Sequence, residues 1–134
     1  MHYASDTRGT HPFRPLWNGV AVGCPQLPTT LPTLDELLGL DGTDESNVAE
    51  KLLQTTAKRQ NHVFTCHAEL EGGKFLQVFD RLLSGWKAQG YMIVGLNSLF
   101  RTLDPAKLPR HEVVYGEVPG RSGTIAVQGQ EASE

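Results

Sequence analysis

His67 is the residue of this sequence whose position best suits chemistry. It lies near the end of a strand-like run, residues 62–69, and carboxylates and glycines follow it directly. Histidine titrates near neutral pH and suits proton transfer, and barrel-type α/β proteins carry their chemistry at the carboxyl ends of strands. The pattern predicts a site at His67. The alternative is an edge strand on which this histidine only faces water, packs or forms a hydrogen bond.

Alternation along a strand would divide the residues of this run between two faces. The face of His67 becomes polar toward its end, as a site requires, whereas the opposite face is apolar or small, as packing against helices requires. The first face holds Val63, Thr65, His67 and Glu69, and the second holds Phe64, Cys66, Ala68 and Leu70.

The histidines and cysteines offer no self-contained metal site. The five histidines include no H-x-x-x-H pair, and no C-x-x-C pattern occurs. His62 and His67 are five residues apart, so on one strand they would face opposite ways. Cys24 and Cys66 are too few for a disulfide framework. They could pair with each other, but we expect Cys66 to be a small buried core residue and both thiols to be reduced.

Proline and glycine divide the first third of the chain. Residues 1–5 are expected to form a short strand, and residues 6–33 hold five of the eight prolines, which predicts an extended loop. Thr33 is predicted to cap a short helix that ends at Gly39, with Glu36 as its capping-box partner. The apolar anchors expected for the loop are Phe13, Leu16, Trp17, Val20, Val22 and Leu27.

The rest of the chain alternates between helix and strand patterns, which predicts βαβ units and a parallel sheet. A second helix is expected over residues 44–60. The clearest helix covers residues 74–89, where Phe75, Phe79, Leu82, Leu83 and Trp86 follow helical spacing. We further expect a strand over 91–96, a short helix to Leu103, an extended segment over 111–118, and a polar, loosely ordered tail from Arg121.

Composition indicates a soluble globular domain or part of one. The chain has 134 residues, 39% of them hydrophobic and 20% charged. A net charge of −3 gives no basic footprint for nucleic acid. No apolar run of about 18 residues and no signal-peptide pattern occurs, so we expect a cytoplasmic protein. No G-x-S-x-G motif supports a serine hydrolase. The chain starts almost inside a strand pattern, which suggests a truncated or split protein.

Five segments of the chain resemble one known family, the polysaccharide-deacetylase-like deformylases that act on formamido-arabinose linked to undecaprenyl phosphate. The resemblance runs almost from end to end of this chain, but it covers only about the carboxy-terminal half of a full-length family member. The matching segments are residues 3–9 (YASDTRG), 12–15 (PFRP), 26–37 (QLPTTLPTLDEL), 65–72 (TCHAELEG) and 116–123 (GEVPGRSG).

This resemblance implies a fold and a set of site residues. The fold would be α/β, the C-terminal portion of an incomplete (β/α) barrel of the polysaccharide deacetylase type, over residues 1–120, followed by a polar tail over 121–134. His67 would be the general acid that protonates the leaving amine. Asp6 would be the carboxylate that orients it, or else an Asx-turn residue. The family binds a divalent metal through ligands upstream of every matching segment, so none is assigned to this chain.

The substrate implied by the resemblance carries a phosphate and a sugar. Arg8 and Arg14 would bind the phosphate or the sugar, since guanidinium recognises phosphate with two hydrogen bonds. Each could instead be a surface arginine paired with an acid. Glu69 would bind a sugar hydroxyl or the amino group, or would simply be solvated.

The implied activity is hydrolysis of an N-formyl amide on a lipid-linked aminosugar, a step in lipid A modification and cationic-peptide resistance. The chain would work at the cytoplasmic face of the inner membrane, with the missing N-terminal half as a partner. The alternatives are a deacetylase of another N-acylated sugar, and an inactive partial barrel. For the isolated chain we expect no activity and self-association through an unpaired sheet edge.

Overall fold

The computed structural model describes residues 1–133, which form two compact units. Unit 1 comprises Met1–Thr30, Val94–Val118 and the residues from Ser122 on. Unit 2 comprises Leu31–Ile93 together with Pro119–Arg121. Each unit is described by itself.

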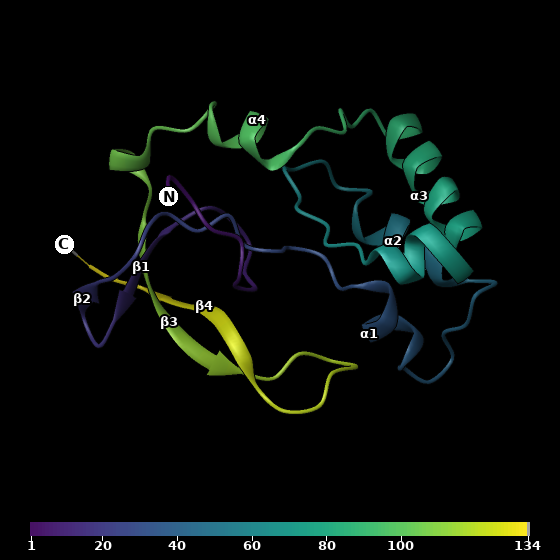
Figure 1. Ribbon diagram of the computed structural model, residues 1–134, viewed down its shortest axis with the longest axis horizontal. Helices are drawn as coiled ribbons and strands as arrows, with labels where there is room; N and C mark the ends of the chain where they lie inside the picture. Colours follow the sequence, from purple (N-terminus) through teal and green to yellow (C-terminus); the bar gives the residue numbers. More distant parts are fainter. Residues whose placement is uncertain (134) are drawn as a thin grey trace. The chain divides into compact units, whose positions relative to one another are not determined.

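Unit 1 contains a four-stranded mixed sheet with the order β2-β1-β3-β4. Its strands are β1 (Arg14–Trp17), β2 (Val20–Ala21), β3 (Arg110–Gly116) and β4 (Ile125–Glu131). The β1–β3 pair is parallel, and the β1–β2 and β3–β4 pairs are antiparallel. Figure 1 shows β3 and β4 side by side as the longest strands of this sheet.

The turn between β1 and β2 is formed by Asn18 and Gly19, at φ 50° and 79°. Two central residues with positive φ are typical of the tight turns that match the twist of a β-hairpin, and the Asn-Gly pair favours them. The helical segments of unit 1, α4 (Leu96–Phe100) and the 3-10 turn η2 (Pro105–Lys107), precede β3.

The proline-rich loop of unit 1 is well ordered around a few buried side chains. Phe13, Leu16 and Leu27 are buried, so the prediction of apolar anchors is confirmed for them. The same prediction is wrong for Trp17, Val20 and Val22, which are exposed. These three lie in or next to the β1–β2 hairpin at the edge of the sheet.

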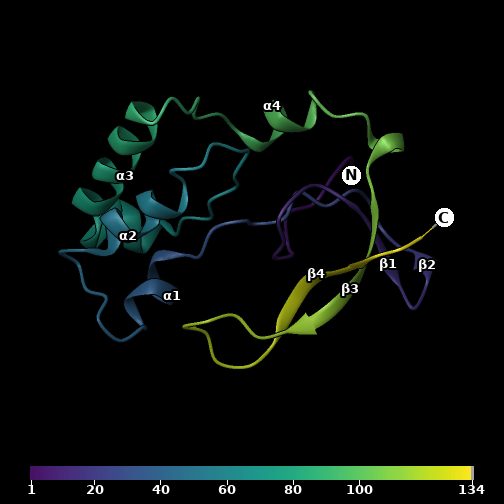
Figure 2. The same ribbon diagram turned by 180° about the vertical axis from the view of Figure 1, so that it is seen from behind.

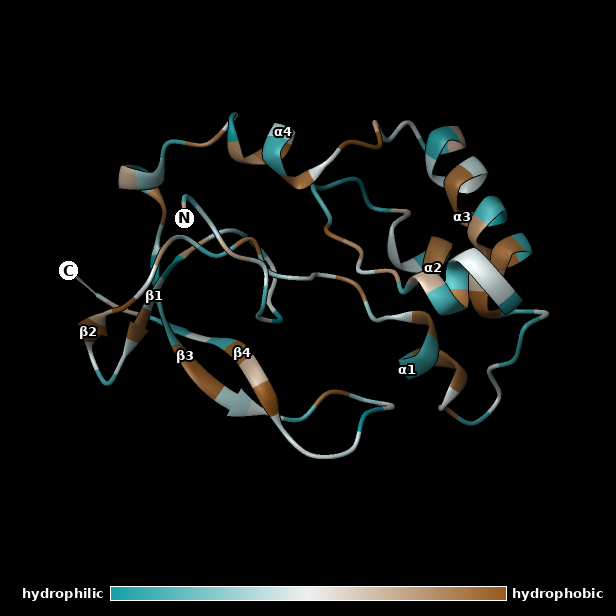
Figure 3. Cartoon of the chain, in the orientation of Figure 1, coloured by the Kyte–Doolittle hydropathy of each residue, from teal (hydrophilic) through white to brown (hydrophobic). Residues whose placement is uncertain are grey.

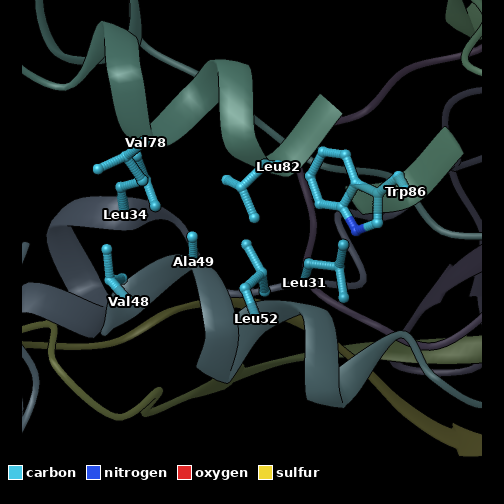
Figure 4. Close-up of a cluster of buried hydrophobic side chains, with 8 residues drawn as sticks. All are labelled: Leu31, Leu34, Val48, Ala49, Leu52, Val78, Leu82 and Trp86. Atoms are coloured by element: carbon cyan, nitrogen blue, oxygen red, sulfur yellow. The ribbon is translucent and has the colours of Figure 1, made fainter. Parts of the chain in front are cut away.

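Unit 2 is helical. It consists of α1 (Leu34–Leu38), α2 (Val48–Thr55) and α3 (Leu76–Ala88) around one apolar cluster. Figure 2 gives the reverse view of these helices, and Figure 3 shows apolar and polar stretches alternating along α3, as expected of a helix with one buried face. The cluster, drawn in Figure 4, contains Leu31, Leu34, Val48, Ala49, Leu52, Val78, Leu82 and Trp86.

A buried carboxylate, Glu36, ties the start of α1 to residues 119–121. It accepts a hydrogen bond from the backbone N–H of Thr33 at 3.1 Å, the Glu36 half of the predicted capping box. The same side chain pairs with the guanidinium of Arg121 at 2.9 Å. Gly120, at φ 84°, packs so closely that an added Cβ would lie 2.0 Å from the Glu36 carbonyl oxygen. Only glycine therefore fits at position 120.

Three predicted strands are absent, and in the first, over residues 1–5, only an isolated bridge pairs Ala4 with Gln26. The other two lie over residues 62–69 and 91–96. Residues 61–67 form no helix or strand, Ala68 and Glu69 are helical, and the π-type turn η1 (Leu70–Lys74) leads into α3. Residues 91–95 are likewise irregular. The physical reason is that a strand needs a neighbour to take up its backbone N–H and C=O groups. No residue of the described segment 31–93 belongs to a strand, so no strand of this segment pairs with either run.

Other predictions have mixed outcomes. The helix expected over 74–89 and the extended segment over 111–118 are confirmed by α3 and β3. The helix expected over 44–60 is shorter than predicted, since only α2 forms within it. The prediction of a loosely ordered tail is wrong, because β4 lies in this part of the chain and pairs with β3. The α/β class is confirmed, but with one parallel strand pair the sheet is not a run of βαβ units. The barrel type stays a prediction.

We expect Leu82→Ala to lower the free energy of unfolding by about 2–5 kcal/mol, because Leu82 is fully buried in the cluster of unit 2 and its removal leaves a cavity. Urea unfolding followed by far-ultraviolet circular dichroism measures the change. Leu76→Ala is the matched control on the same helix, since Leu76 is 56% exposed. Equal losses for the two variants would contradict the packing described here.

Candidate functional site

The backbone at His67 is held by the carboxylate of Glu71. The His67 N–H donates to Glu71 Oε2 at 2.8 Å, and the His67 carbonyl accepts from the N–H groups of Leu70 and Glu71, each at 3.0 Å. The two residues thus bond each other in both directions, backbone to side chain and backbone to backbone. Such a pair, four residues apart, closes the first turn of a helix. His67 therefore occupies the entrance of a helical turn and not the end of a strand.

Two polar atoms at this turn are buried without a hydrogen-bond partner among the described residues. They are Nδ1 of His67 and Oε1 of Glu71. Glu71 is almost wholly buried, and His67 is half-buried. A buried polar atom without a partner costs free energy, roughly 1–3 kcal/mol, unless a water or a ligand supplies the partner. The turn thus holds an imidazole nitrogen and a carboxylate oxygen with unused hydrogen-bonding capacity.

The segment that precedes His67 packs on α3 through aromatic side chains. Phe64 meets Trp86 edge to face, with ring centroids 5.3 Å apart. The Trp86 indole in turn donates from Nε1 to Thr56 Oγ1 at 3.1 Å. Cys66 is exposed, so its predicted place in the core is wrong. The alternation of a strand does not apply to an irregular segment, which explains why the prediction failed. Both cysteines are free thiols.

Asp6 has a hydrogen-bond partner within unit 1. Its Oδ1 accepts a hydrogen bond from the Gln26 side-chain nitrogen at 2.7 Å. The buried Gln26 amide also accepts from Thr7 Oγ1 at 3.1 Å, so it fixes the loop around Asp6. Asp6 lies in unit 1 and His67 in unit 2. Their predicted pairing stays a prediction.

The three predicted substrate-binding residues also divide between the units. Arg8 and Arg14, both half-buried, lie in unit 1, whereas the exposed Glu69 lies in unit 2. Arg14 donates from Nε to the Leu108 carbonyl at 2.8 Å, which orients its guanidinium. The backbone of Arg8 pairs with that of Ala126 and Gln128 and so joins the loop to β4.

Reasoning from the sequence missed Glu71. Its position four residues after His67 is the spacing of one helical turn. The helical spacing was not recognised because the residues before His67 have the alternation of a strand.

The aspartate, glutamate, histidine and cysteine side chains of residues 1–133 form no group of three or more that would hold a metal ion. The residues present therefore do not fit the divalent metal that the resemblance implies. No helix in the described part of the chain is long and apolar enough to cross a bilayer.

Comparison with known proteins identifies relatives of this chain. It is 36% identical over 128 residues to the probable 4-deoxy-4-formamido-L-arabinose-phosphoundecaprenol deformylase ArnD of Shewanella sediminis (strain HAW-EB3), covering 96% of this chain and 40% of that protein. With the ArnD of Wigglesworthia glossinidia brevipalpis, which carries the same description, it shares 32% identity over 128 residues, covering 94% of this chain and 44% of that protein. The chain is ArnD-like. The resemblance drawn from the matching segments is thereby confirmed.

The ArnD-like chain spans less than half of the length of these two relatives, 40% and 44%. No family model matches it. Similarity along nearly the whole of this chain carries the relationship.

We expect Glu71→Ala to lower the free energy of unfolding by about 1–3 kcal/mol, because the His67 N–H loses its acceptor. Glu71→Gln keeps a carbonyl oxygen at this place and should retain more of the stability. Urea unfolding of both variants measures the difference. Indistinguishable stabilities for the unsubstituted chain and the alanine variant would show that the hydrogen bond does not hold the turn.

Burial lowers the pKa of His62 below its ordinary value of 6.5. The unfolded chain therefore takes up this proton at a higher pH than the folded chain does, so stability should fall as the pH drops below about 6.5. His62→Gln should reduce this part of the pH dependence, measured as urea midpoints between pH 5 and pH 8. His2→Gln, at an exposed histidine, is the control. An unchanged pH profile in His62→Gln would contradict the assignment.

Proposed function

We propose that this chain is the carboxy-terminal part of an ArnD-like deformylase. The reaction would be hydrolysis of the formyl amide of 4-deoxy-4-formamido-L-arabinose-phosphoundecaprenol, the substrate in the names of the two relatives described above. The observation that carries the proposal is similarity over 96% and 94% of this chain. Because the chain covers less than half of each relative, we propose that the complete activity needs the remaining part.

His67 would supply the proton in this reaction. Hydrolysis adds water to the formyl carbon and then breaks the C–N bond, and the departing nitrogen must take up a proton. A histidine is suited to this step because its pKa lies near working pH. Two features support the role: Glu71 holds the backbone at His67, and the imidazole Nδ1 has unused hydrogen-bonding capacity.

Asp6 would position His67 by accepting a hydrogen bond from its ring. A carboxylate partner holds the imidazole in one tautomer and raises its basicity. The contact with Gln26 uses Asp6 Oδ1, and a carboxylate offers a second oxygen for the imidazole. Asp6 is exposed, so this oxygen is accessible.

Arg14 and Arg8 would bind the phosphate of the lipid carrier, and Glu69 would bind the sugar. The Arg14 Nε is committed to the Leu108 carbonyl, but a guanidinium has five N–H donors, and the remaining four can face a phosphate. A phosphate between arginines would be held by charge-assisted hydrogen bonds. The exposure of Glu69 is consistent with a contact to a sugar hydroxyl or to the released amine.

The remaining parts of the proposal follow from the substrate. Undecaprenyl phosphate is a membrane lipid, so the enzyme would work at the cytoplasmic face of the inner membrane. Deformylation frees an amine that is positively charged at neutral pH, which suits a role in lipid A modification and cationic-peptide resistance. The incomplete barrel of the polysaccharide deacetylases would be completed by the part of the relatives that this chain does not cover. The divalent metal would bind to ligands in that part.

The test is formate release from the lipid-linked formamido sugar by this chain, alone and co-expressed with the upstream part of an ArnD relative. We expect activity only in the pair, and a decrease of roughly 10²- to 10⁴-fold with His67→Ala, the usual contribution of a general acid. His2→Ala controls for loss of an exposed histidine.

Full activity of the His67→Ala pair would remove His67 from the mechanism while leaving the deformylase proposal intact. A folded pair without activity would instead favour the alternative of a non-catalytic partial domain. Activity on an N-acetylated sugar, in place of the formamido sugar, would favour a deacetylase.

A further inference from the structure

Glu71 is a buried carboxylate without a part in the reaction proposed above. Its side chain is 2% exposed, and its Oε2 accepts the His67 N–H at 2.8 Å. The His67 carbonyl oxygen accepts the N–H of Glu71 in return at 3.0 Å. Because the two residues bond each other in both directions within one helical turn, a displacement of Glu71 displaces the backbone that carries the His67 ring.

The second oxygen of this carboxylate has no such contact. Oε1 of Glu71 is buried, and no group of the described chain forms a hydrogen bond with it. An ionised carboxylate oxygen only accepts hydrogen bonds, so the partner that it needs is a donor. A buried charged group without a partner costs more free energy than a neutral one, which makes a donor at this oxygen strongly favoured.

The ring of His67 offers the matching donor in the same turn. Its Nδ1 is also buried and forms no hydrogen bond with any of residues 1–133. A proton on Nδ1 makes this nitrogen a donor, but the two atoms do not bond each other directly. A water that accepts from Nδ1 and donates to Glu71 Oε1 would satisfy both, and buried waters bind polar groups that otherwise lack partners.

This arrangement leaves the other ring nitrogen, Nε2, for proton transfer. A charged imidazole has a proton on each nitrogen. When it gives its Nε2 proton to the departing nitrogen, the neutral ring keeps the proton on Nδ1. An acceptor at Nδ1 therefore favours the tautomer that the reaction leaves behind, in the way that an orienting carboxylate acts on a catalytic histidine.

We propose that Glu71 is a positioning residue that acts through His67 in two ways. Oε2 holds the backbone at His67, and Oε1 holds the Nδ1 proton through one buried water, so that Nε2 is directed to the substrate. The inference rests on the proposed role of His67 as the proton donor. Both contacts lie within unit 2, so this positioning does not require Asp6, which lies in unit 1.

The first test is the tautomer of His67 in the ¹⁵N-labelled 134-residue chain, from two-bond ¹H–¹⁵N spectra at pH 8, where an ordinary histidine is neutral. We expect the proton on Nδ1, and the spectrum of His67→Ala identifies the resonances. In Glu71→Gln the amide oxygen still accepts the His67 N–H, but the amide nitrogen donates to the water. The water then donates to Nδ1, so the ring proton should move to Nε2.

Glu69→Gln is the matched control for the tautomer, because it neutralises an exposed carboxylate two residues from His67. It should leave the ring proton on Nδ1. A proton on Nε2 in the unsubstituted chain, or a tautomer that Glu71→Gln does not change, would overturn the proposal. This test needs no substrate, so its outcome does not depend on whether the pair of chains is a deformylase.

The second test is steady-state deformylation by this chain co-expressed with the upstream part of an ArnD relative. Glu71→Gln should lower kcat by about 10²- to 10⁴-fold, the contribution of a correctly placed general acid, and leave KM unchanged. Glu45→Gln, at an exposed carboxylate, should change neither, and circular dichroism verifies that both variants fold. An unchanged kcat in Glu71→Gln would overturn the positioning role. A pair without any activity would count against the proposed function, and the tautomer would then decide on Glu71.

Discussion

The candidate site depends on one interaction, the hydrogen bond that the buried carboxylate of Glu71 accepts from the backbone N–H of His67. This bond lies at the point where an irregular segment becomes a helix. Burying a carboxylate is costly unless hydrogen bonds compensate it. The position of His67 is therefore linked to the turn that leads into α3, and through α3 to the apolar cluster of unit 2.

In unit 1 a neutral group, the side-chain amide of Gln26, likewise holds an irregular segment in place. The buried amide of Gln26 bonds both Asp6 and Thr7, so a loop with few regular elements keeps one conformation. An amide both donates and accepts, which lets one side chain serve a carboxylate and a hydroxyl at once. Each unit thus presents one proposed catalytic or positioning residue on a segment without regular secondary structure, held by a buried polar side chain nearby.

The histidines of this chain illustrate how surroundings decide what an imidazole can do. The ring of His67 has a nitrogen with unused hydrogen-bonding capacity, which suits proton transfer. At His11 and His111, by contrast, the other nitrogens are occupied by Thr10 and Gly129, and the Nε2 atoms face each other. The Gln128 amide also lies 3.2 Å from His11 Nε2, so this second arrangement joins the two rings to the surrounding hydrogen bonds. Histidines of one chain therefore differ in what they can do, because a ring nitrogen has unused hydrogen-bonding capacity at His67 and the ring nitrogens of His11 and His111 all have partners.

The sequence alone determined the features that depend on contacts between residues close together in the chain. The apolar spacing of α3, the capping of α1 by Thr33 and Glu36, and the Asn18-Gly19 turn all involve contacts within a few residues. The segments that resemble ArnD could also be recognised in the sequence. Tertiary structure decided whether residues 62–69 and 91–96 became strands, since a strand exists only where a partner takes up its hydrogen bonds. It also decided that β4 forms and that His11 meets His111, because residues far apart in the chain must be brought together by folding.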